Sequence, residues 1–166
     1  MQERCKIGVV IGNANSPHAV NIMKGIDQAS KERDGQLMYF MNVSSPYTAQ
    51  LYPPDKSIGW DYQKSAIYDY ARYVKADVLI MTYGMMSIFM KSDYGKQYLE
   101  YFRNVPCVLI NEQTDRPNWT SIIVDNYNGM YELVEHLVRD HGYHNFAFLA
   151  GPPGNTDACQ RKRAFL

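Results

Sequence analysis

The sequence lacks any hydrophobic run long enough to cross a membrane. Its 166 residues are 46% hydrophobic and 20% charged, but no stretch approaches the ~18 uninterrupted apolar residues of a transmembrane helix. The N-terminal residues MQERCK are polar and lead directly into a short apolar segment. They provide neither the long apolar core nor the small-residue cleavage site of a secretory signal. The composition therefore predicts a soluble globular protein with no membrane partner.

Cysteine is scarce, and neither sign of charge is in excess. Cys5, Cys107 and Cys159 are odd in number and far apart in the chain, which fits a reducing cytosol better than a disulfide framework. Lys plus Arg and Asp plus Glu number 17 each, so no overall charge draws the chain to nucleic acid. The sequence predicts a cytoplasmic location and gives no electrostatic reason for direct DNA binding.

Motifs for phosphate or dinucleotide cofactors are also missing. Residues 151–156 begin like a phosphate-binding loop, but Thr156 and Asp157 stand where the second glycine and the lysine are needed. Residues 8–12 lack the glycine spacing of the dinucleotide fingerprint. We therefore expect no cofactor.

No recognisable catalytic or metal-binding motif is present. There is no Gly-x-Ser-x-Gly elbow and no His-Glu-x-x-His sequence. His136, His141 and His144 have no carboxylate or thiol at a diagnostic ligand spacing, so solvated histidines are favoured over a metal site. A flavodoxin-like enzyme stays open as an alternative, although no residue argues for catalysis.

The clearest local pattern lies in residues 122–153. Apolar runs at residues 121–124 and 146–150 flank a stripe of residues with helical spacing: Met130, Leu133, Val134, Leu137 and Val138. Asn126 or Asn128 is expected to cap this helix, and Gly142 to follow its last turn in the left-handed conformation. The pattern predicts a β-α-β unit.

The rest of the chain alternates between apolar runs and helical patterns. Strands are predicted at residues 6–11, 36–43, 77–82, 106–111 and 120–124, and helices up to residue 33, at 62–75 and at 94–103. Residues 44–60 have no periodicity, and residues 83–90 are predicted to form a loop. This alternation predicts an α/β fold with a doubly wound parallel sheet, in which ligands bind where strand order reverses. Loops at residues 12–18, 83–87, 111–113 and 125–126 then share one rim.

The ordered set Asp125-Asn126, Gly129, Gly142 and Gly151-Pro152 resembles the ligand-binding domain of the lac/gal repressor family. The match continues to Arg161 and Phe165 and is also detectable at residues 7–25 and 105–111. That family shares a two-lobed, periplasmic-binding-protein-like architecture with sugar-binding transport receptors. The resemblance implies an N-terminal α/β lobe at residues 1–125, followed at residues 126–166 by the crossover and the beginning of a second α/β lobe.

The resemblance also implies that the chain is a fragment of a longer regulator. Repressors of this family begin with a helix-turn-helix headpiece, whereas this chain starts at the first core strand and ends just inside a helix of the second lobe. Contact with DNA is therefore expected only through a headpiece that this chain does not contain.

Polar residues on the predicted rim are candidates for ligand binding. The first lobe supplies Asn13, Ser16, His18 and Tyr83, and the resemblance implies Asp125 near the crossover and Asn155, Asp157 and Arg161 from the second lobe. Amides, hydroxyls and carboxylates would suit a hydroxyl-rich ligand such as a sugar. The alternative, that Asn, Ser and Asp before helices merely cap them, stays open.

The chain departs from the family pattern at several positions. Asn155 and Cys159 occupy the region where some relatives use an arginine to grip ligand, and His18 stands where an aromatic residue is common. Ala164 replaces a frequent glycine. These differences leave the ligand class unassigned.

The leading hypothesis is a small-molecule effector-sensing module of a cytoplasmic, homodimeric regulator of the lac/gal repressor type, with ligand contacting both lobes. Two alternatives are kept: the N-terminal sensor of a signalling protein such as a GGDEF diguanylate cyclase, and a solute-binding transport receptor. The receptor would require an export signal, which the sequence does not display.

Overall fold

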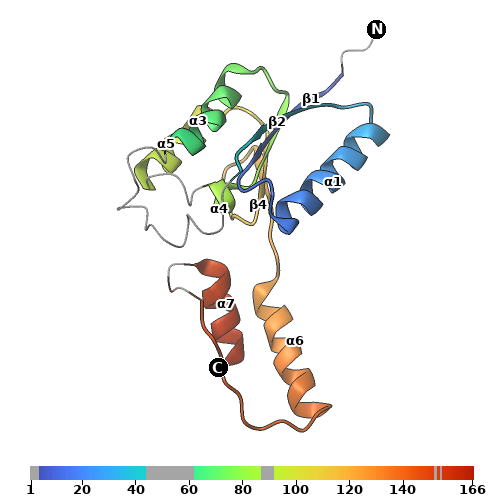
Figure 1. Ribbon diagram of the computed structural model, residues 1–166, viewed down its shortest axis with the longest axis vertical. Coiled ribbons are helices and arrows are strands. Elements are labelled where there is room, and N and C mark those ends of the chain that lie inside the picture. Colours follow the sequence, from blue (N-terminus) through green and yellow to red (C-terminus); the bar gives the residue numbers. More distant parts are fainter. Residues whose placement is uncertain (1–3, 44–61, 87–91, 152, 154) are drawn as a thin grey trace. The chain divides into compact units, whose positions relative to one another are not determined.

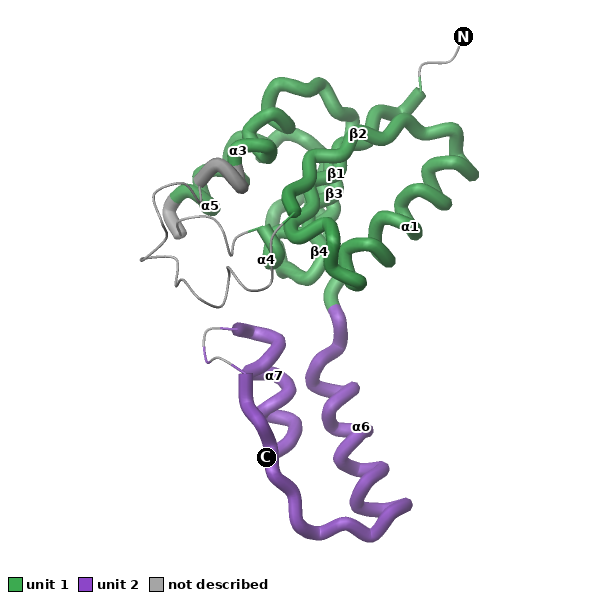
Figure 2. Tube along the Cα trace, in the orientation of Figure 1, with its two compact units in different colours: residues 1–123 green, residues 124–166 purple. Residues whose placement is uncertain are grey.

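The computed structural model describes residues 4–43, 62–86, 92–151, 153 and 155–166 (Figure 1). The chain divides into two compact units, residues 1–123 and residues 124–166 (Figure 2). Each unit is described by itself. The interpretation of residues 1–125 and 126–166 as two lobes stays a prediction. Among the described helices, none combines the length and the apolar character needed to cross a membrane.

Unit 1 is organised on a five-stranded, fully parallel sheet in the order β2-β1-β3-β4-β5. The strands are β1 (Lys6–Ile11), β2 (Gln36–Met41), β3 (Val78–Met81), β4 (Cys107–Ile110) and β5 (Trp119–Ile122). Because β1 pairs with β2 on one side and with β3 on the other, the strand order reverses at β1. The predicted doubly wound α/β sheet is confirmed, and its reversal point lies between β1 and β3.

Successive residues of the central strands contribute to opposite faces of the sheet. Val9 and Ile11 belong to a cluster with Ile22 and Met23 of α1 (Pro17–Glu32). Val10 belongs instead to the cluster that contains Tyr68 of α3 (Tyr62–Tyr70) and Tyr98 of α5 (Ser92–Tyr101). Helices therefore cover both faces, which explains why these parallel strands are apolar at consecutive positions.

Several predicted boundaries in unit 1 need correction. The second strand ends at Met41, because Asn42 leaves the sheet to bond the loop after β1. The helix predicted at residues 62–75 consists of α3 followed by a 3-10 turn, Ala71–Tyr73, and α5 begins at Ser92 rather than at residue 94. The predicted loop at residues 83–90 begins with a short helix, α4 (Tyr83–Met86). The aperiodic residues 44–60 lie outside the described residues.

Unit 2 contains two helices, α6 (Asn126–Arg139) and α7 (Thr156–Phe165), which lie side by side (Figure 2). The ring of Phe148 stacks on that of Phe165 with centroids 4.7 Å apart. A Cβ at Gly151 would lie 2.7 Å from the Cβ of Ala158, so only glycine permits this approach to the first turn of α7. These contacts connect the segment after α6 to α7.

The last element of the predicted β-α-β unit is wrong as a strand. Residues 146–150 form no strand with any described residue, and a β-strand is defined by a hydrogen-bonded neighbour. The predicted apolar stripe of α6 is only partly buried: Leu133 and Val138 remain 51% and 37% exposed, and the other stripe residues are half-buried. The first run does pair in unit 1, where β5 is the neighbour of β4.

Candidate functional site

The loops that follow the strands of unit 1 converge at the carboxyl edge of the sheet. A Cβ at Gly12 would lie 2.6 Å from the backbone of Met85, so the chain after β1 passes closer to α4 than any side chain would permit. The Gly12 N–H donates to Oγ1 of buried Thr82 at 3.1 Å. The ends of β1 and β3 are thereby joined at the point where strand order reverses.

Asn42 connects the end of β2 to the same loop. Its side-chain oxygen accepts a hydrogen bond from the Asn13 N–H at 2.8 Å, and its carbonyl accepts one from the Ala14 N–H at 2.8 Å. Asn42 is buried, and Asn13 adopts a left-handed φ of 51°, a conformation that Asn tolerates better than most residues. The two hydrogen bonds to Asn42 therefore fix the backbone conformation of the loop after β1.

The side-chain oxygen of Asn13 is itself buried and has no hydrogen-bond donor among the described residues. Shielding such an acceptor from water without a partner costs about 1–3 kcal/mol. Among the described rim residues, Asn13 is thus the one whose buried side-chain oxygen is an unsatisfied hydrogen-bond acceptor.

His18 and Asn111 meet across the rim. The Nε2 atom of His18 lies 3.0 Å from Nδ2 of Asn111, which follows β4 and has a φ of 60°. Because the amide nitrogen carries only donors, the imidazole nitrogen accepts. His18 lies in the first turn of α1 and is exposed, so this pair brings together a polar group of that helix and one of the loop after β4.

Tyr83 is half-buried at the first position of α4. A Cβ at Gly95 would lie 2.5 Å from the Tyr83 hydroxyl oxygen, so the phenol lies against α5. Burial raises the pKa of Tyr83, and the negative charge of Glu112 raises it further. This environment indicates a packing role, and the predicted contact of Tyr83 with a ligand stays a prediction.

Three predicted site residues serve as helix caps. Ser16 Oγ accepts from the Ala19 N–H at 3.1 Å at the start of α1, and Asn155 Oδ1 accepts from the Ala158 N–H at 2.8 Å at the start of α7. Asp125 caps α6. The capping alternative is therefore realised at all three positions, and their contact with a ligand stays a prediction.

The predicted cap of α6 by Asn126 or Asn128 is wrong. Asp125 accepts from the Asn128 backbone N–H at 3.1 Å and from its side-chain amide at 2.7 Å. The backbone hydrogen bond, followed by the side-chain one, holds the pKa of Asp125 below its usual range. A carboxylate at this position also interacts favourably with the helix N-terminus.

Arg161 and Asn126 connect α7 to the beginning of α6. The guanidinium of Arg161 donates to the side-chain oxygen of Asn126, and the amide nitrogen of Asn126 donates to the Val124 carbonyl at 3.2 Å. Asn126 is only 6% exposed. Asp157 is half-buried in the first turn of α7. Arg161 therefore has a positioning contact within unit 2, whereas Asp157 makes no hydrogen bond with a described residue that would assign it a role.

Residues Asn42, Thr82, Asn111 and Asn126 were not predicted as site residues. Each follows the end of a predicted or observed strand within a few residues, and that position was the available signal. What sequence reasoning could not supply was the pairing between loops distant in the chain. For metals, the described residues contain no group of three or more His, Cys, Asp or Glu side chains able to hold an ion.

The fold places the chain in a class of proteins. Unit 1 has the parallel α/β sheet of the periplasmic-binding-protein-like fold, and the chain as a whole is similar in fold to solved lac/gal repressor-type regulators and to a periplasmic solute-binding protein. The resemblance and the fold predicted from the sequence are confirmed.

The particular relatives support this assignment. In sequence, the chain is 27% identical over 108 residues to the probable HTH-type transcriptional repressor ExuR of Bacillus subtilis (strain 168). The aligned region covers 59% of this chain and 32% of the repressor. No family model matches the chain. This chain spans about a third of the length of the ExuR repressor.

Solved structures agree on the fold. The lac repressor dimer bound to operator and the anti-inducer ONPF matches 99% of this chain and 50% of its own, with a TM-score of 0.67 and 19% identity. The transcription regulator CcpA of Lactococcus lactis gives 0.65 and 15%, covering 98% and 52%. A periplasmic solute-binding protein of an ABC transporter from Actinobacillus succinogenes 130z, with bound D-allose, gives 0.67 and 18%, covering 98% and 55%.

Proposed function

We propose that this chain is the effector-sensing part of a bacterial transcription regulator of the lac/gal repressor type. The carrying observation is the polar rim of unit 1, where the segments after β1, β2, β3 and β4 place amides and a hydroxyl, and the first turn of α1 places an imidazole, at the carboxyl edge of a parallel sheet. This edge is where doubly wound sheets bind ligands. The sequence similarity to a repressor supports the regulatory reading.

The ligand class that suits this rim is a small hydroxyl-rich molecule, either a sugar or a related polar metabolite. Asn13 contributes an acceptor without a donor among the described residues, and His18 and Asn111 form an exposed pair with an amide donor. Such groups reward a ligand that offers matching hydroxyls and penalise one that leaves them unpaired. One structural neighbour was solved with D-allose, which makes monosaccharides the first compounds to test.

Unit 2 offers a second set of candidate contacts. Asn155 and Asp157 lie at the start of α7, where backbone N–H groups and the helix dipole favour polar ligands. Asp125 and Arg161 have hydrogen-bond partners within unit 2. We propose that Asn155 and Asp157 contact the ligand, and that Asp125 and Arg161 hold the beginning of α6 in place.

The decisive experiment is a thermal-shift screen of the gene's complete product with D-glucose, D-galactose, D-allose and ONPF. A ligand at a hundred times its Kd stabilises the protein by about 2.7 kcal/mol. His18→Ala, and Asn155→Ser combined with Asp157→Ala, should each lose most of that stabilisation. Serine at position 155 keeps a capping oxygen, so apo stability should stay within about 1 kcal/mol.

Gln28→Ala is the matched control, because Gln28 is an exposed residue of α1 whose side-chain amide donates to Glu32 of the same helix. This control should retain the full ligand-induced shift. Unchanged shifts in the His18 and Asn155/Asp157 variants would remove those residues from the site. A panel that leaves every melting temperature unchanged would contradict the sugar class.

We also propose a homodimer in the cytoplasm that contacts DNA through a headpiece outside this chain. One structural neighbour is a repressor dimer bound to operator, and the three cysteines are all unpaired. The GGDEF sensor and the transport receptor share the fold, but the sequence relative is a repressor. If the complete gene product binds an operator and a sugar changes that binding, the result would support a repressor function. Sugar binding without any DNA binding would contradict a repressor function.

A further inference from the structure

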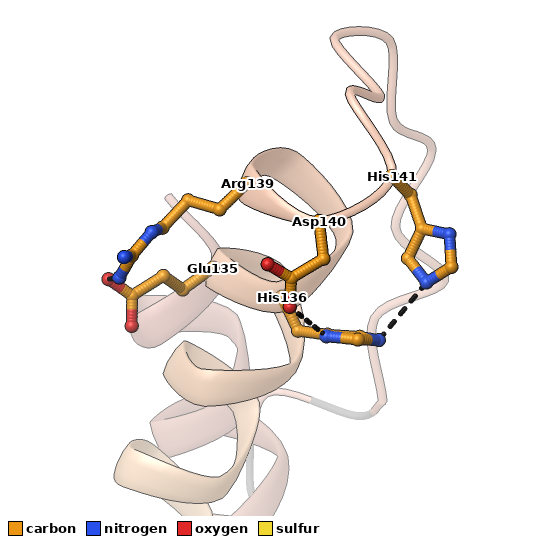
Figure 3. A network of polar contacts seen from close by, with 5 residues as sticks. All are labelled: Glu135, His136, Arg139, Asp140 and His141. Carbon is orange, nitrogen blue, oxygen red and sulfur yellow. Dashed lines mark hydrogen bonds and ion pairs between the residues drawn. The ribbon is translucent and has the colours of Figure 1, made fainter.

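The C-terminal end of α6 brings two histidines into direct contact. The Nε2 atoms of His136 and His141 lie 3.1 Å apart, with the imidazole planes 85° to each other (Figure 3). The sequence favoured three independent, solvated histidines in this region. The structure separates them into a facing pair, His136 and His141, and an exposed His144 that is not part of the pair.

Each imidazole of the pair also contacts a second side chain, which fixes its orientation. The Nδ1 atom of His136 lies 2.6 Å from a carboxylate oxygen of Asp140, one helical turn further on (Figure 3). The ring of His141 stacks on Tyr143 at 5.7 Å and 8° between planes. Gly142, between these residues, has a φ of +67°, which turns the chain back beside the helix end.

This arrangement matches the requirements of imidazole ligation to a metal. A carboxylate that accepts from Nδ1–H fixes the tautomer in which Nε2 is the free electron-pair donor, and raises the basicity of that nitrogen. Two nitrogens that bind one tetrahedral ion at ~2.05 Å stand about 3.3 Å apart, close to the separation observed here. The adjacent Glu135 is bonded instead to Arg139 at 3.0 Å, so it does not compete with Asp140 for the imidazole.

We propose that His136 and His141 form a binding site for one divalent transition-metal ion, with Asp140 as the residue that orients His136. The ion binds the lone pairs of both Nε2 atoms; His141 changes to the tautomer that carries its hydrogen on Nδ1, by exchange with solvent, so both imidazoles stay neutral and no net proton is released. No group of three ligating side chains occurs among the described residues, so water completes the coordination. His136 is about half exposed, and the ion therefore reaches the pair without unfolding of α6.

Imidazole pairs select among ions by chemistry. They suit Zn²⁺, Cu²⁺ and Ni²⁺, whereas Mg²⁺ prefers oxygen ligands. The site is independent of the proposed sugar sensing, because none of its residues belongs to the polar rim or to the candidate contacts of α7. Loss of one function would leave the other intact.

The test is isothermal titration of ZnCl₂ into the chain without any affinity tag, in a buffer that does not chelate metal. One Zn²⁺ per chain is expected, with no response to MgCl₂. His136→Gln and His141→Gln should each weaken zinc binding at least tenfold, and Asp140→Ala about tenfold, the usual lower effect of removing a carboxylate behind a ligating histidine. His144→Gln, the matched control, should bind zinc as the parent does.

A second readout reports on the atoms themselves. Imidazole ¹⁵N spectra should show zinc shifting the Nε2 resonances of His136 and His141 while Nδ1 of His136 stays protonated. Circular dichroism of the zinc-free variants checks that α6 is retained, which is expected because all four substituted side chains are exposed. Equal zinc affinity in His136→Gln or His141→Gln, or the absence of saturable binding up to millimolar zinc, would overturn the proposal.

Discussion

Replacing Gly12 with alanine should destabilise unit 1 through a steric conflict at the rim. The added Cβ would lie 2.6 Å from both the carbonyl carbon and the oxygen of Met85, and 2.8 Å from the Met86 nitrogen. Distances under 3.0 Å are essentially never seen for real Cβ atoms. The atoms in conflict belong to the backbone of α4, so no flexible side chain can move aside.

The expected cost follows from this geometry. Overpacking a close-packed interior costs about 1–3 kcal/mol, and conflict with backbone places Gly12→Ala in the upper half of that range. For a chain of this size, each kcal/mol lowers the melting temperature by about 2–4 °C. We expect a fall of about 4–12 °C, measured by thermal and urea unfolding with far-UV circular dichroism.

Gly25→Ala is the matched control for this prediction. Gly25 lies within α1, and a Cβ there would meet nothing within 4 Å. Alanine should therefore stabilise the helix by about 0.5–1 kcal/mol, so the two substitutions should have opposite signs. A Gly12→Ala protein within about 0.5 kcal/mol of the parent, the range of ordinary surface changes, would refute the close approach of β1 to α4.

Three further predictions concern the stability effects of changing Thr82, Gly142 and Asp125. Thr82→Val removes the acceptor of the Gly12 N–H and should cost about 1–3 kcal/mol; hydrogen exchange at Gly12 should accelerate, whereas Thr82→Ser should keep it protected. Gly142→Ala places a side chain at a φ of +67° and should cost about 1–2 kcal/mol, read as faster exchange in the last turn of α6. Because hydrogen bonds from Asn128 lower the pKa of Asp125 in the folded state, its contribution to α6 should be present above the unfolded pKa and fade as the pH falls through the lower folded one. Asp125→Asn should remove this pH dependence, followed by circular dichroism below pH ~4; an unchanged profile would contradict the assignment.

The sequence by itself determined the class of fold. Strands such as β1 and β3 are apolar at consecutive positions, which indicates burial on both faces, and helical patterns separate them, which requires parallel crossovers. The resemblance carried by Asp125-Asn126, Gly142 and Gly151 pointed to the same architecture, and the structural neighbours agree. These features are readable because periodicity and turn residues act over a few neighbouring positions.

Only the tertiary structure decided which polar groups meet. Gly12 bonds Thr82 across 70 residues, and His18 reaches Asn111 across 93, separations at which local patterns carry no information. Residues 146–150 have the composition of a strand, yet they have no strand partner among the described residues, since pairing belongs to two segments and not to one. The contact between the His136 and His141 rings likewise depends on the turn at Gly142, whose backbone conformation brings the two rings together.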